Sequence, residues 1–243
     1  MKFIEFDSLE STNRYCESLD LKDVEAFTVV WAHNQTCGLG QRGNAWHSAP
    51  GLNLTFSMVL HPHNLPAADQ YNLTIQCSAA IAQHIESTLC ADGCTSPVYI
   101  KWPNDIYIGR HKVCGTLIVN ELAANKVASA ICGIGLNVNE TEFPNHLPNP
   151  TSLSAATGRE YNLTTMLQGL CRKIKATTLH TPFEESMDYY LRHLYRKGIE
   201  ADYLYNGQPL RATITGINRY GHLLLTTANN RSLSCQLKEI VFL

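Results

Sequence analysis

The sequence predicts an α+β fold in which a large mixed domain is followed by a small β domain. Along residues 1–197, apolar runs typical of strands and amphipathic segments typical of helices follow one another with no internal repeat. Turn signals between neighbouring strand-like runs indicate antiparallel pairing. Residues 198–243 hold mainly short β runs broken by glycine and asparagine. We therefore expect one domain at 1–197 and a second at 198–243.

The strands of the large domain are predicted from compact apolar or alternating runs rich in β-forming residues. They are expected at 2–6, 27–33, 52–60, 98–102, 105–108, 113–119 and 127–138. The runs on either side of Gly109-Arg110 indicate a hairpin. Residues 36–51 are rich in glycine and residues 140–150 contain three prolines, so both stretches are expected to be loops.

Helices are predicted where apolar side chains share one face or where a capping residue begins the run. Ser11-Thr12-Asn13 offers N-cap side chains for a helix that ends near residue 19. The clearest helix covers 68–90, and two more are expected near 163–179 and 182–197, the last with a Thr-Pro start. Residues 198–206 would leave the large domain. Four strands would then form a small barrel, at Leu210–Ile217, His222–Thr227, Ser232–Gln236 and Glu239–Phe242.

Composition narrows the classes of function. A net charge of −2, with 44% hydrophobic and 16% charged residues, fits an ordinary globular protein rather than one that coats nucleic acid or binds an anionic membrane. Charges interrupt the apolar residues at the start of the chain, so no signal peptide is expected, and no run reaches the ~20 apolar residues of a membrane helix. Nine cysteines without a CxxC pair predict reduced thiols in a cytoplasmic protein. Cys90, Cys94 and His84 lack a second ligand pair, so we expect no metal site in the protein itself.

The glycine-rich loop Gly38-Leu39-Gly40-Gln41-Arg42-Gly43 can present successive backbone N–H groups to an anion. It is neither a P-loop nor a Rossmann turn, because it lacks Gly-Lys-Ser/Thr and a strand rather than a helix follows it. Arg42 could clamp a phosphate or a carboxylate. Taken alone, the loop is equally well explained as a flexible surface loop.

Two further segments carry polar groups at the ends of predicted strands. The segment Lys101-Trp102-Pro103-Asn104-Asp105 places a cation and a carboxylate at a turn. A tryptophan such as Trp102 more often belongs to a core. Lys112, seven residues further on, is by itself typical of a surface lysine. Gly133-Ile-Gly-Leu-Asn137 ends a strand with two glycines, which indicates either a bulge or room for a flat ring. No Ser-His-Asp order compels nucleophilic catalysis. The segments in this order favour activation of a carboxylate by a nucleotide.

With these residues in view, the chain resembles the biotin–protein ligases, which biotinylate a carrier domain of carboxylases such as acetyl-CoA carboxylase. The resemblance starts at Ser11-Thr12-Asn13 and Gln35 and continues weakly into the small β domain. Between them it includes the glycine-rich loop, Lys101–Asp105, Lys112-x-x-Gly115, Gly133–Asn137 and Thr151-Ser152-Leu153. It implies a mixed central sheet flanked by helices, as in class II synthetases, and a C-terminal SH3-like barrel.

The resemblance also implies a reaction in two halves. The biotin carboxylate attacks the α-phosphorus of ATP with the help of Mg²⁺, which gives biotinyl-5′-AMP and pyrophosphate. The amine of an acceptor lysine then attacks the mixed anhydride. A loop that orders over the acyl phosphate is expected to exclude water, and residues 36–51 are our candidate.

Site residues follow from the same resemblance, position by position. Biotin would be bound by Ser11, Thr12, Asn13, Gln35, Gly38, Leu39, Gly40, Gln41, Lys112, Gly115, Gly133 and Gly135. The nucleotide would be bound by Arg42, Gly43, Trp46, Lys101, Asn104 and Asn137. The catalytic residues would be Lys112, Lys101, Arg42 and Asp105, the last by orienting the metal or the acceptor lysine.

Departures from the family pattern shape the remaining expectations. Many members have Gly-Arg-Gly-Arg where this chain has Gly38-Leu39-Gly40-Gln41, and glutamate at the position of Val119. We hypothesise that the adenylate is held less tightly here. Some members carry a helix-turn-helix before the ligase part; this sequence starts without one, so no DNA binding is expected. An exposed sheet edge would allow a homodimer.

Two rival functions remain. A lipoate–protein ligase uses the same acyl-adenylate chemistry on a related fold, although the C-terminal β domain and Lys101–Asp105 favour biotin. A weakly active biotin sensor would keep the pocket without the reaction. Only Leu39 and Gln41 favour the sensor.

Overall fold

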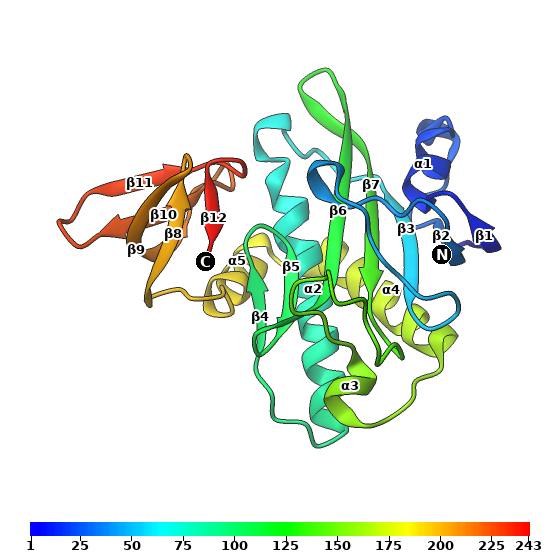
Figure 1. Cartoon of the computed structure of the whole chain (residues 1–243). Helices are drawn as coiled ribbons and strands as arrows, with labels where there is room; N and C mark the ends of the chain where they lie inside the picture. The colour runs from blue at the N-terminus through cyan, green and yellow to red at the C-terminus, as the bar shows by residue number, and fades with distance from the viewer.

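A seven-stranded mixed sheet with helices packed against it forms the body of the protein, and a smaller sheet stands beside it (Figure 1). The computed structural model describes residues 1–243 except the side chain of Arg42. The large sheet has the order β1-β2-β3-β7-β6-β5-β4. Only β1 and β2 pair in parallel, and every other neighbouring pair is antiparallel. Its strands are β1 Phe3–Leu9, β2 Val29–Gln35, β3 Leu54–Leu60, β4 Val98–Lys101, β5 Asp105–Ile108, β6 His111–Ala123 and β7 Lys126–Leu136.

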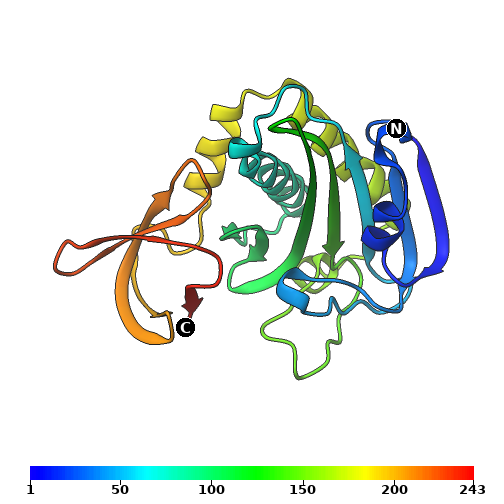
Figure 2. The ribbon, with the colours of Figure 1, turned by 90° about the horizontal axis from the view of Figure 1, so that it is seen from above.

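The helices gather mostly on one face of this sheet, as the view from above shows (Figure 2). They are α1 Thr12–Glu17, α2 Tyr71–Ala91, α3 Leu153–Thr157, α4 Leu163–His180 and α5 Phe183–Arg192. Short 3₁₀ turns occur at η1 Leu21–Asp23, η2 Gln41–Gly43 and η3 Ala67–Asp69. Helix α2 packs against both α4 and α5. No helix among the described residues is long and apolar enough to span a membrane.

The pleat of β7 decides which residues face the site. Ile131 packs in a small core with Cys16 of α1, whereas its neighbour Cys132 belongs to the main core with Cys77 of α2. Because successive side chains of a strand point to opposite faces, the odd-numbered positions 133 and 135 share the face of Ile131. The two glycines of β7 therefore lie on the α1 side of the sheet, away from the main core.

The small sheet has five antiparallel strands in the order β11-β10-β9-β8-β12. They are β8 Glu200–Tyr205, β9 Gln208–Ile217, β10 Leu223–Thr227, β11 Ser232–Cys235 and β12 Ile240–Phe242. Trp102, which is buried, donates its Nε1–H to the carbonyl of Gly221 at 2.8 Å and so ties the small sheet to the turn after β4. The interpretation of Trp102 as a packed side chain is correct, while the domain boundary near residue 198 stays a prediction.

The structure differs from the sequence predictions of local structure at four points. Helix α5 ends at Arg192, not near 197, because the chain after it pairs with β4: Ile100 donates its N–H to His193, and Tyr195 donates to Ile100. The supposed exit at 198–206 contains strand β8, and the short helix α3 was not foreseen. Ser11 begins α1, but its side chain makes no capping hydrogen bond.

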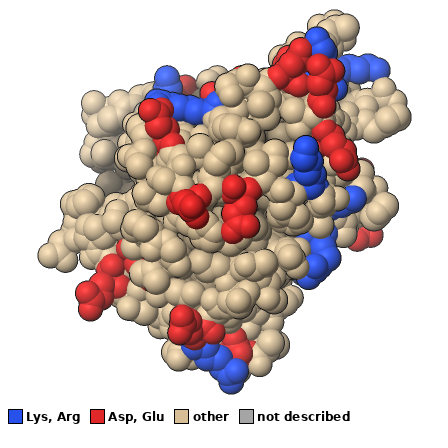
Figure 3. Space-filling model, turned by 90° about the vertical axis from the view of Figure 1, so that its right-hand side faces the viewer, with Lys and Arg blue, Asp and Glu red and all other residues tan. Residues whose placement is uncertain are grey.

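The face over β1 and α1 carries charged side chains in small, separate groups, and most of it is neither basic nor acidic (Figure 3). Strand β1 is an edge of the large sheet and pairs only with β2. A homodimer formed through an exposed sheet edge stays a prediction.

Candidate functional site

A pocket of about 310 Å³ opens over the α1 face of the large sheet, beside the glycine-rich loop. Most of the predicted site residues line it. They are Ser11, Thr12, Asn13, Gln35, Leu39, Gly40, Gln41, Trp46, Lys101, Asp105, Lys112, Gly115, Gly133 and Gly135. The fold thus brings together four segments that are far apart in the sequence.

A few of the predicted site residues do not line the pocket. Gly38 pairs with Trp46 across the loop, its carbonyl accepting the N–H of Trp46 at 2.9 Å. Asn104 lines a neighbouring cavity instead. Gly43 and Asn137 do not line the pocket. The side chain of Arg42 lies outside the described part of the chain, so its predicted role stays a prediction.

Glycines form the floor of the pocket because neighbouring side chains occupy the space above them. Gly115 of β6 lies directly opposite Gly135 of β7 in the sheet register. A Cβ on Gly135 would come within 2.2 Å of the Trp46 ring, and one on Gly133 within 2.0 Å of Asn13 Oδ1. Real Cβ atoms do not approach that closely, so these positions admit only glycine while Trp46 and Asn13 stay where they are.

At the α1 end, buried polar side chains form a connected network. The Gln35 carbonyl oxygen accepts hydrogen bonds from the backbone N–H of Thr12 at 2.7 Å and from its hydroxyl at 3.1 Å. The hydroxyl of Ser57 lies 2.8 Å from Thr12 Oγ1 and 2.5 Å from Asn13 Oδ1. Asn13 in turn donates to the carbonyl of Leu117 at 3.3 Å. The network fixes donors and acceptors at the pocket wall, as recognition of a polar ring requires.

Trp46 covers the glycine floor. Its ring lies over Gly135 and Gly115, and Lys112 Nζ sits 5.5 Å from the ring centre. The indole Nε1–H is buried and has no hydrogen-bond partner among the side chains and backbone that the structure describes. A buried indole N–H normally finds an acceptor. Trp46 is therefore a donor available to a polar group in the pocket.

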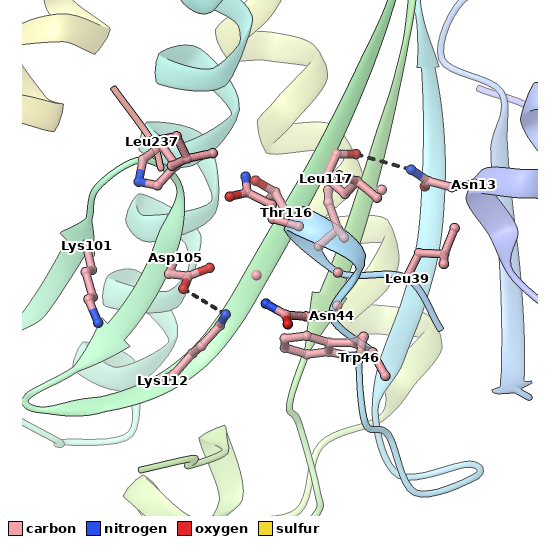
Figure 4. Close-up of a pocket in the computed structure, with 18 of the residues that line it drawn as sticks. Asn13, Leu39, Asn44, Trp46, Lys101, Asp105, Lys112, Thr116, Leu117 and Leu237 are labelled. Carbon is pink, nitrogen blue, oxygen red and sulfur yellow. Dashed lines mark hydrogen bonds and ion pairs between the residues drawn. The ribbon is translucent and has the colours of Figure 1, made fainter. Parts of the chain in front are cut away.

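Two lysines and one carboxylate stand at the other end of the pocket (Figure 4). Lys112 Nζ is 2.7 Å from Asp105 Oδ2. Lys101 donates to the Tyr107 hydroxyl at 3.2 Å and lies 5.1 Å from the Phe242 ring. Burial lowers the pKa of Lys101, Asp105 opposes this shift, and the positive charges of Lys112 and Arg196 add to it. An anion bound here would stabilise the ammonium that burial disfavours.

The glycine-rich loop is fastened to the β4–β5 turn by an amide pair. Gln41 donates to Asn104 Oδ1 at 2.9 Å, and Asn104, itself 2% exposed, donates to the carbonyl of Thr116 at 2.9 Å. Gln41 and Asn104 are both uncharged, so this contact between loop and sheet involves no cation. We call this contact the Gln41–Asn104 latch.

The far end of the loop is held by a buried carboxylate. Glu140, 2% exposed, accepts hydrogen bonds from His47 Nε2 at 2.9 Å, from the N–H of Ala49 at 3.2 Å and from the side chain of Asn53. Asn53 also accepts the N–H of Val138 at 2.9 Å. These bonds anchor the chain just after Trp46 to the end of β7.

Sequence reasoning missed part of the pocket wall. Ser57 belongs to a buried strand and gave no polar-motif signal. The small sheet contributes apolar residues that close the lysine end, and nothing distinguishes these from other β-strand residues in the sequence. The unpredicted lining residues are Asn44, Ala45, Trp102, Pro103, Thr116, Leu117, Ile134, Leu237, Ile240, Val241 and Phe242.

The mixed sheet, the glycine floor and the two lysines form a pocket that can accept a flat polar ring and an anionic group side by side. Comparison with known proteins agrees. The model of the biotin/lipoate A/B protein ligase family matches residues 5–137, which is more than half of the chain. The chain therefore belongs to the biotin/lipoate A/B protein ligase family. The family and the fold class predicted from the sequence are both confirmed.

Curated relatives show the same likeness. The bifunctional ligase/repressor BirA of Bacillus subtilis (strain 168) is 35% identical over 165 residues, 67% of this chain and 49% of that protein. The biotin--[acetyl-CoA-carboxylase] ligase of Paracoccus denitrificans is 33% identical over 110 residues, 45% of this chain and 43% of that protein. The chain spans about half the length of the curated BirA relatives of Bacillus that it matches.

Solved structures match over almost the whole chain. A mutant of the biotin protein ligase from Aquifex aeolicus in complex with biotin superposes with a TM-score of 0.76 at 25% identity, covering 100% of this chain and 98% of that one. The same ligase in complex with biotin and ATP gives 0.78 at 24% identity, with 99% and 97% covered. The second likeness shows the fold, including the small C-terminal sheet.

Proposed function

We propose that this protein is an ATP-dependent biotin–protein ligase. It forms biotinyl-5′-AMP from biotin and ATP and transfers the biotinyl group to a lysine of a biotin carboxyl carrier domain in a biotin-dependent carboxylase. The observation that carries the proposal is the glycine floor of Gly115, Gly133 and Gly135, which runs from a buried polar network to Lys112. The related ligases that bind biotin and ATP support it.

In this proposal the polar network receives the biotin ring. Thr12, Asn13 and Gln35 supply a hydroxyl, an amide and a carbonyl at one end of the floor. The tail of biotin lies over Gly115 and Gly135, so the Trp46 ring, which fills this space in the structure, must shift to make room for it. Its carboxylate then reaches Lys112 at the other end of the floor. The carboxylate of biotin and that of Asp105 compete for the ammonium of Lys112. Lys112 therefore gives up part of its contact with Asp105 when biotin binds.

The first half-reaction needs positive charge where the α-phosphate gains negative charge. Lys101 and Lys112 both line the pocket, and the buried position of Lys101 strengthens its attraction for a phosphate. The biotin carboxylate oxygen bonds to the α-phosphorus, and the bond to the pyrophosphate oxygen breaks. Asn104 and Asn137 are proposed to serve the nucleotide, and Arg42 to neutralise phosphate charge.

Magnesium would accompany the nucleotide rather than occupy a ready-made protein site. The described residues contain no cluster of three potential metal ligands, and Asp105 is the one carboxylate lining the pocket there. Mg²⁺ usually binds through one or two carboxylates together with substrate phosphates, so this donor set fits it. Asp105 would hold the ion, which would supply further positive charge to the phosphates.

The loop 36–51 shields the mixed anhydride from water. Trp46 covers the floor, and the Gln41–Asn104 latch holds the loop against the sheet. Excluding water matters because hydrolysis of the adenylate would waste it before transfer. Residues Leu237 and Phe242 of the small sheet close the lysine end of the same pocket.

In the second half-reaction the acceptor lysine enters beside Asp105. Its amine attacks the carbonyl carbon of the anhydride, so a carbon–nitrogen bond forms. AMP leaves with the electron pair of the broken carbon–oxygen bond, and the amine gives up a proton. Asp105 is placed to orient this amine and to receive the proton once Lys112 has turned to the ligand.

The test is biotin-dependent exchange of labelled pyrophosphate into ATP with the purified chain and Mg²⁺, run in parallel with lipoate. We expect exchange with biotin and none with lipoate. Exchange with lipoate alone would make the protein a lipoate ligase, a function that the family also includes. Binding of biotin by calorimetry without any exchange would make it a sensor and refute the proposal.

A further inference from the structure

A further hollow, of about 890 Å³, lies beside β4: Tyr99 of this strand lines the hollow, and Lys101 of the same strand lines the pocket. The turn between β5 and β6 and the chain that joins α5 to β8 form its walls; Figure 1 shows these segments next to one another below the small sheet. Four cations line it: Arg110, Arg192, Arg196 and Lys197. Among the described residues, no aspartate or glutamate lines it.

Two of the four cations have a partner of their own. Arg192 pairs with Asp188 at 2.9 Å, and Arg196 donates to the carbonyl of Leu243 at 2.8 Å. Arg110 and Lys197 are exposed and form no ion pair within the described part of the chain. The hollow therefore presents a positive field to solvent although the whole chain has a net charge of −2.

The same hollow exposes apolar and aromatic surface. Tyr99, Tyr195 and Leu191 are half-buried in its walls, and Ile199 at its rim is 60% exposed. Arginine and tyrosine next to exposed aliphatic carbon are enriched in protein–protein interfaces. A site built for free phosphate alone would have no use for an exposed isoleucine.

Only one layer of side chains separates this hollow from the reactive pocket. The ring of Tyr195 stacks on Tyr107 with centroids 5.5 Å apart, and the Tyr107 hydroxyl accepts a hydrogen bond from Lys101 at 3.2 Å. Arg196 is near enough to Lys101 to contribute to the lowering of its pKa, after burial. A protein seated in the hollow would therefore hold its adjacent surface close to Asp105 and Lys112.

We propose that the hollow is the docking surface for the acceptor protein. The acceptor presents acidic side chains to Arg110, Arg196 and Lys197 and an apolar contact to Ile199, and this positions its target lysine at the mouth of the pocket. The inference rests on the proposed function, because it assigns the surface that serves the second half-reaction. It requires an acceptor with acidic side chains within reach of the lysine that is modified.

The experiment separates docking from adenylate formation. In the double variant Arg110→Glu/Lys197→Glu, two unpaired cations of the hollow become anions. The matched control is Lys2→Glu/Arg231→Glu, which makes the same charge change at exposed residues outside the hollow. The probe is a purified biotin carboxyl carrier domain of acetyl-CoA carboxylase, with biotinylation followed by mass spectrometry. Biotin-dependent pyrophosphate exchange is measured on the same preparations.

We expect the double variant to raise the KM for the carrier domain by about tenfold or more at low salt, with kcat within about twofold and pyrophosphate exchange unchanged. The control variant should match the wild type. Added salt should raise the wild-type KM and lower the KM of the double variant, because screening weakens the attraction in the wild type and the repulsion in the variant.

An unchanged carrier KM in the double variant, together with normal exchange, would overturn the docking proposal. So would retention of a single-stranded oligonucleotide by the wild type but not by the variant at the same salt, since the hollow would then serve nucleic acid. If the wild type fails to exchange pyrophosphate, the proposed function itself is wrong and the docking assignment falls with it.

Discussion

The pocket and the hollow lie on either side of the Tyr107–Tyr195 stack, yet they are built in different ways. The pocket is made of backbone and buried polar groups: its floor is glycine, and its wall is the network around Asn13. The hollow is made of long charged side chains that reach solvent. A reaction on a bound ligand needs a rigid, buried surface like that of the pocket. Transient binding of a partner protein is served by an exposed, charged surface like that of the hollow.

The two surfaces should also respond differently to substitution. A buried group that loses its partner, or a side chain forced into filled space, commonly costs several kcal/mol because water cannot take over the contact. An exposed charge contributes roughly 0–1 kcal/mol and is weakened by salt. Substitutions in the pocket should therefore abolish biotin binding or adenylate formation, whereas substitutions in the hollow should change the apparent affinity for the acceptor protein.

The largest effect is expected from Lys112→Met. In the proposed reaction the ammonium of Lys112 meets the carboxylate and the developing acyl phosphate, so its removal should lower pyrophosphate exchange by about 10²–10³-fold. The steady-state exchange rate at saturating biotin is the measurement, with Lys2→Met as the control on an exposed lysine. Exchange within tenfold of wild type would show that Lys112 does not contact the reacting groups.

Gly135→Ala tests the glycine floor. The new methyl would lie 2.2 Å from the Trp46 ring, so the indole must leave its place or the strand must shift. We expect biotin binding, measured by calorimetry, to weaken by about 10²-fold, or nearly 3 kcal/mol. The control is Gly216→Ala in the small sheet, where the nearest atom would be 3.7 Å away. Equal biotin affinity in both variants would exclude this floor as the ligand site.

Leu39→Arg tests whether the loop lacks a cation that would retain the adenylate. Leu39 lines the pocket, so an arginine there can pair with a phosphate. Release of biotinyl-AMP, followed after a chase with unlabelled biotin and ATP, should slow by about tenfold, which corresponds to roughly 1.4 kcal/mol. Unchanged release kinetics would reject the hypothesis and leave the Gln41–Asn104 latch as the main restraint on the loop.

The smallest effect on activity is expected from His84→Leu, because His84 lies on α2 and lines neither cavity. Burial, reinforced by Lys173 and Arg172, lowers the pKa of His84 from 6.5 to about 4. The folded state therefore favours neutral His84. Its contribution to the free energy of unfolding is present above pH 6.5 and is lost as the pH falls from 6.5 to about 4. The loss amounts to at most about 3 kcal/mol.

Denaturant unfolding of wild type and His84→Leu between pH 7 and pH 4 measures this loss. The variant should lose less stability than the wild type as the pH falls, while its pyrophosphate exchange at pH 7 stays normal. Parallel pH curves for the two proteins would contradict the assignment.

Most of the pocket could be predicted through the family resemblance, because the residues that carry the resemblance fall in short contiguous segments. Gly133 and Gly135 are two positions apart on one strand, so their shared face follows from the pleat alone. The latch could not be predicted, since Gln41 and Asn104 meet only after the loop folds over the sheet. Nor could Ser57, which looks like any polar residue in a strand.

The hollow gave no sequence signal at all. Its walls combine Tyr99 and Arg110 with residues 191–199, and the latter stretch was expected to be helix as far as 197. The helix stops early because the chain forms hydrogen bonds with Ile100 of β4. That tertiary pairing, which no local pattern encodes, turns Arg196 and Lys197 toward the same hollow as Arg110.

The most direct test of the central claim is a crystal structure of the protein with biotin bound. The account predicts the ring of biotin beside Thr12, Asn13 and Gln35, the tail over Gly115 and Gly135, and the carboxylate within hydrogen-bonding distance of Lys112 Nζ. Biotin bound elsewhere, or in this pocket with its carboxylate turned away from Lys112, would contradict it.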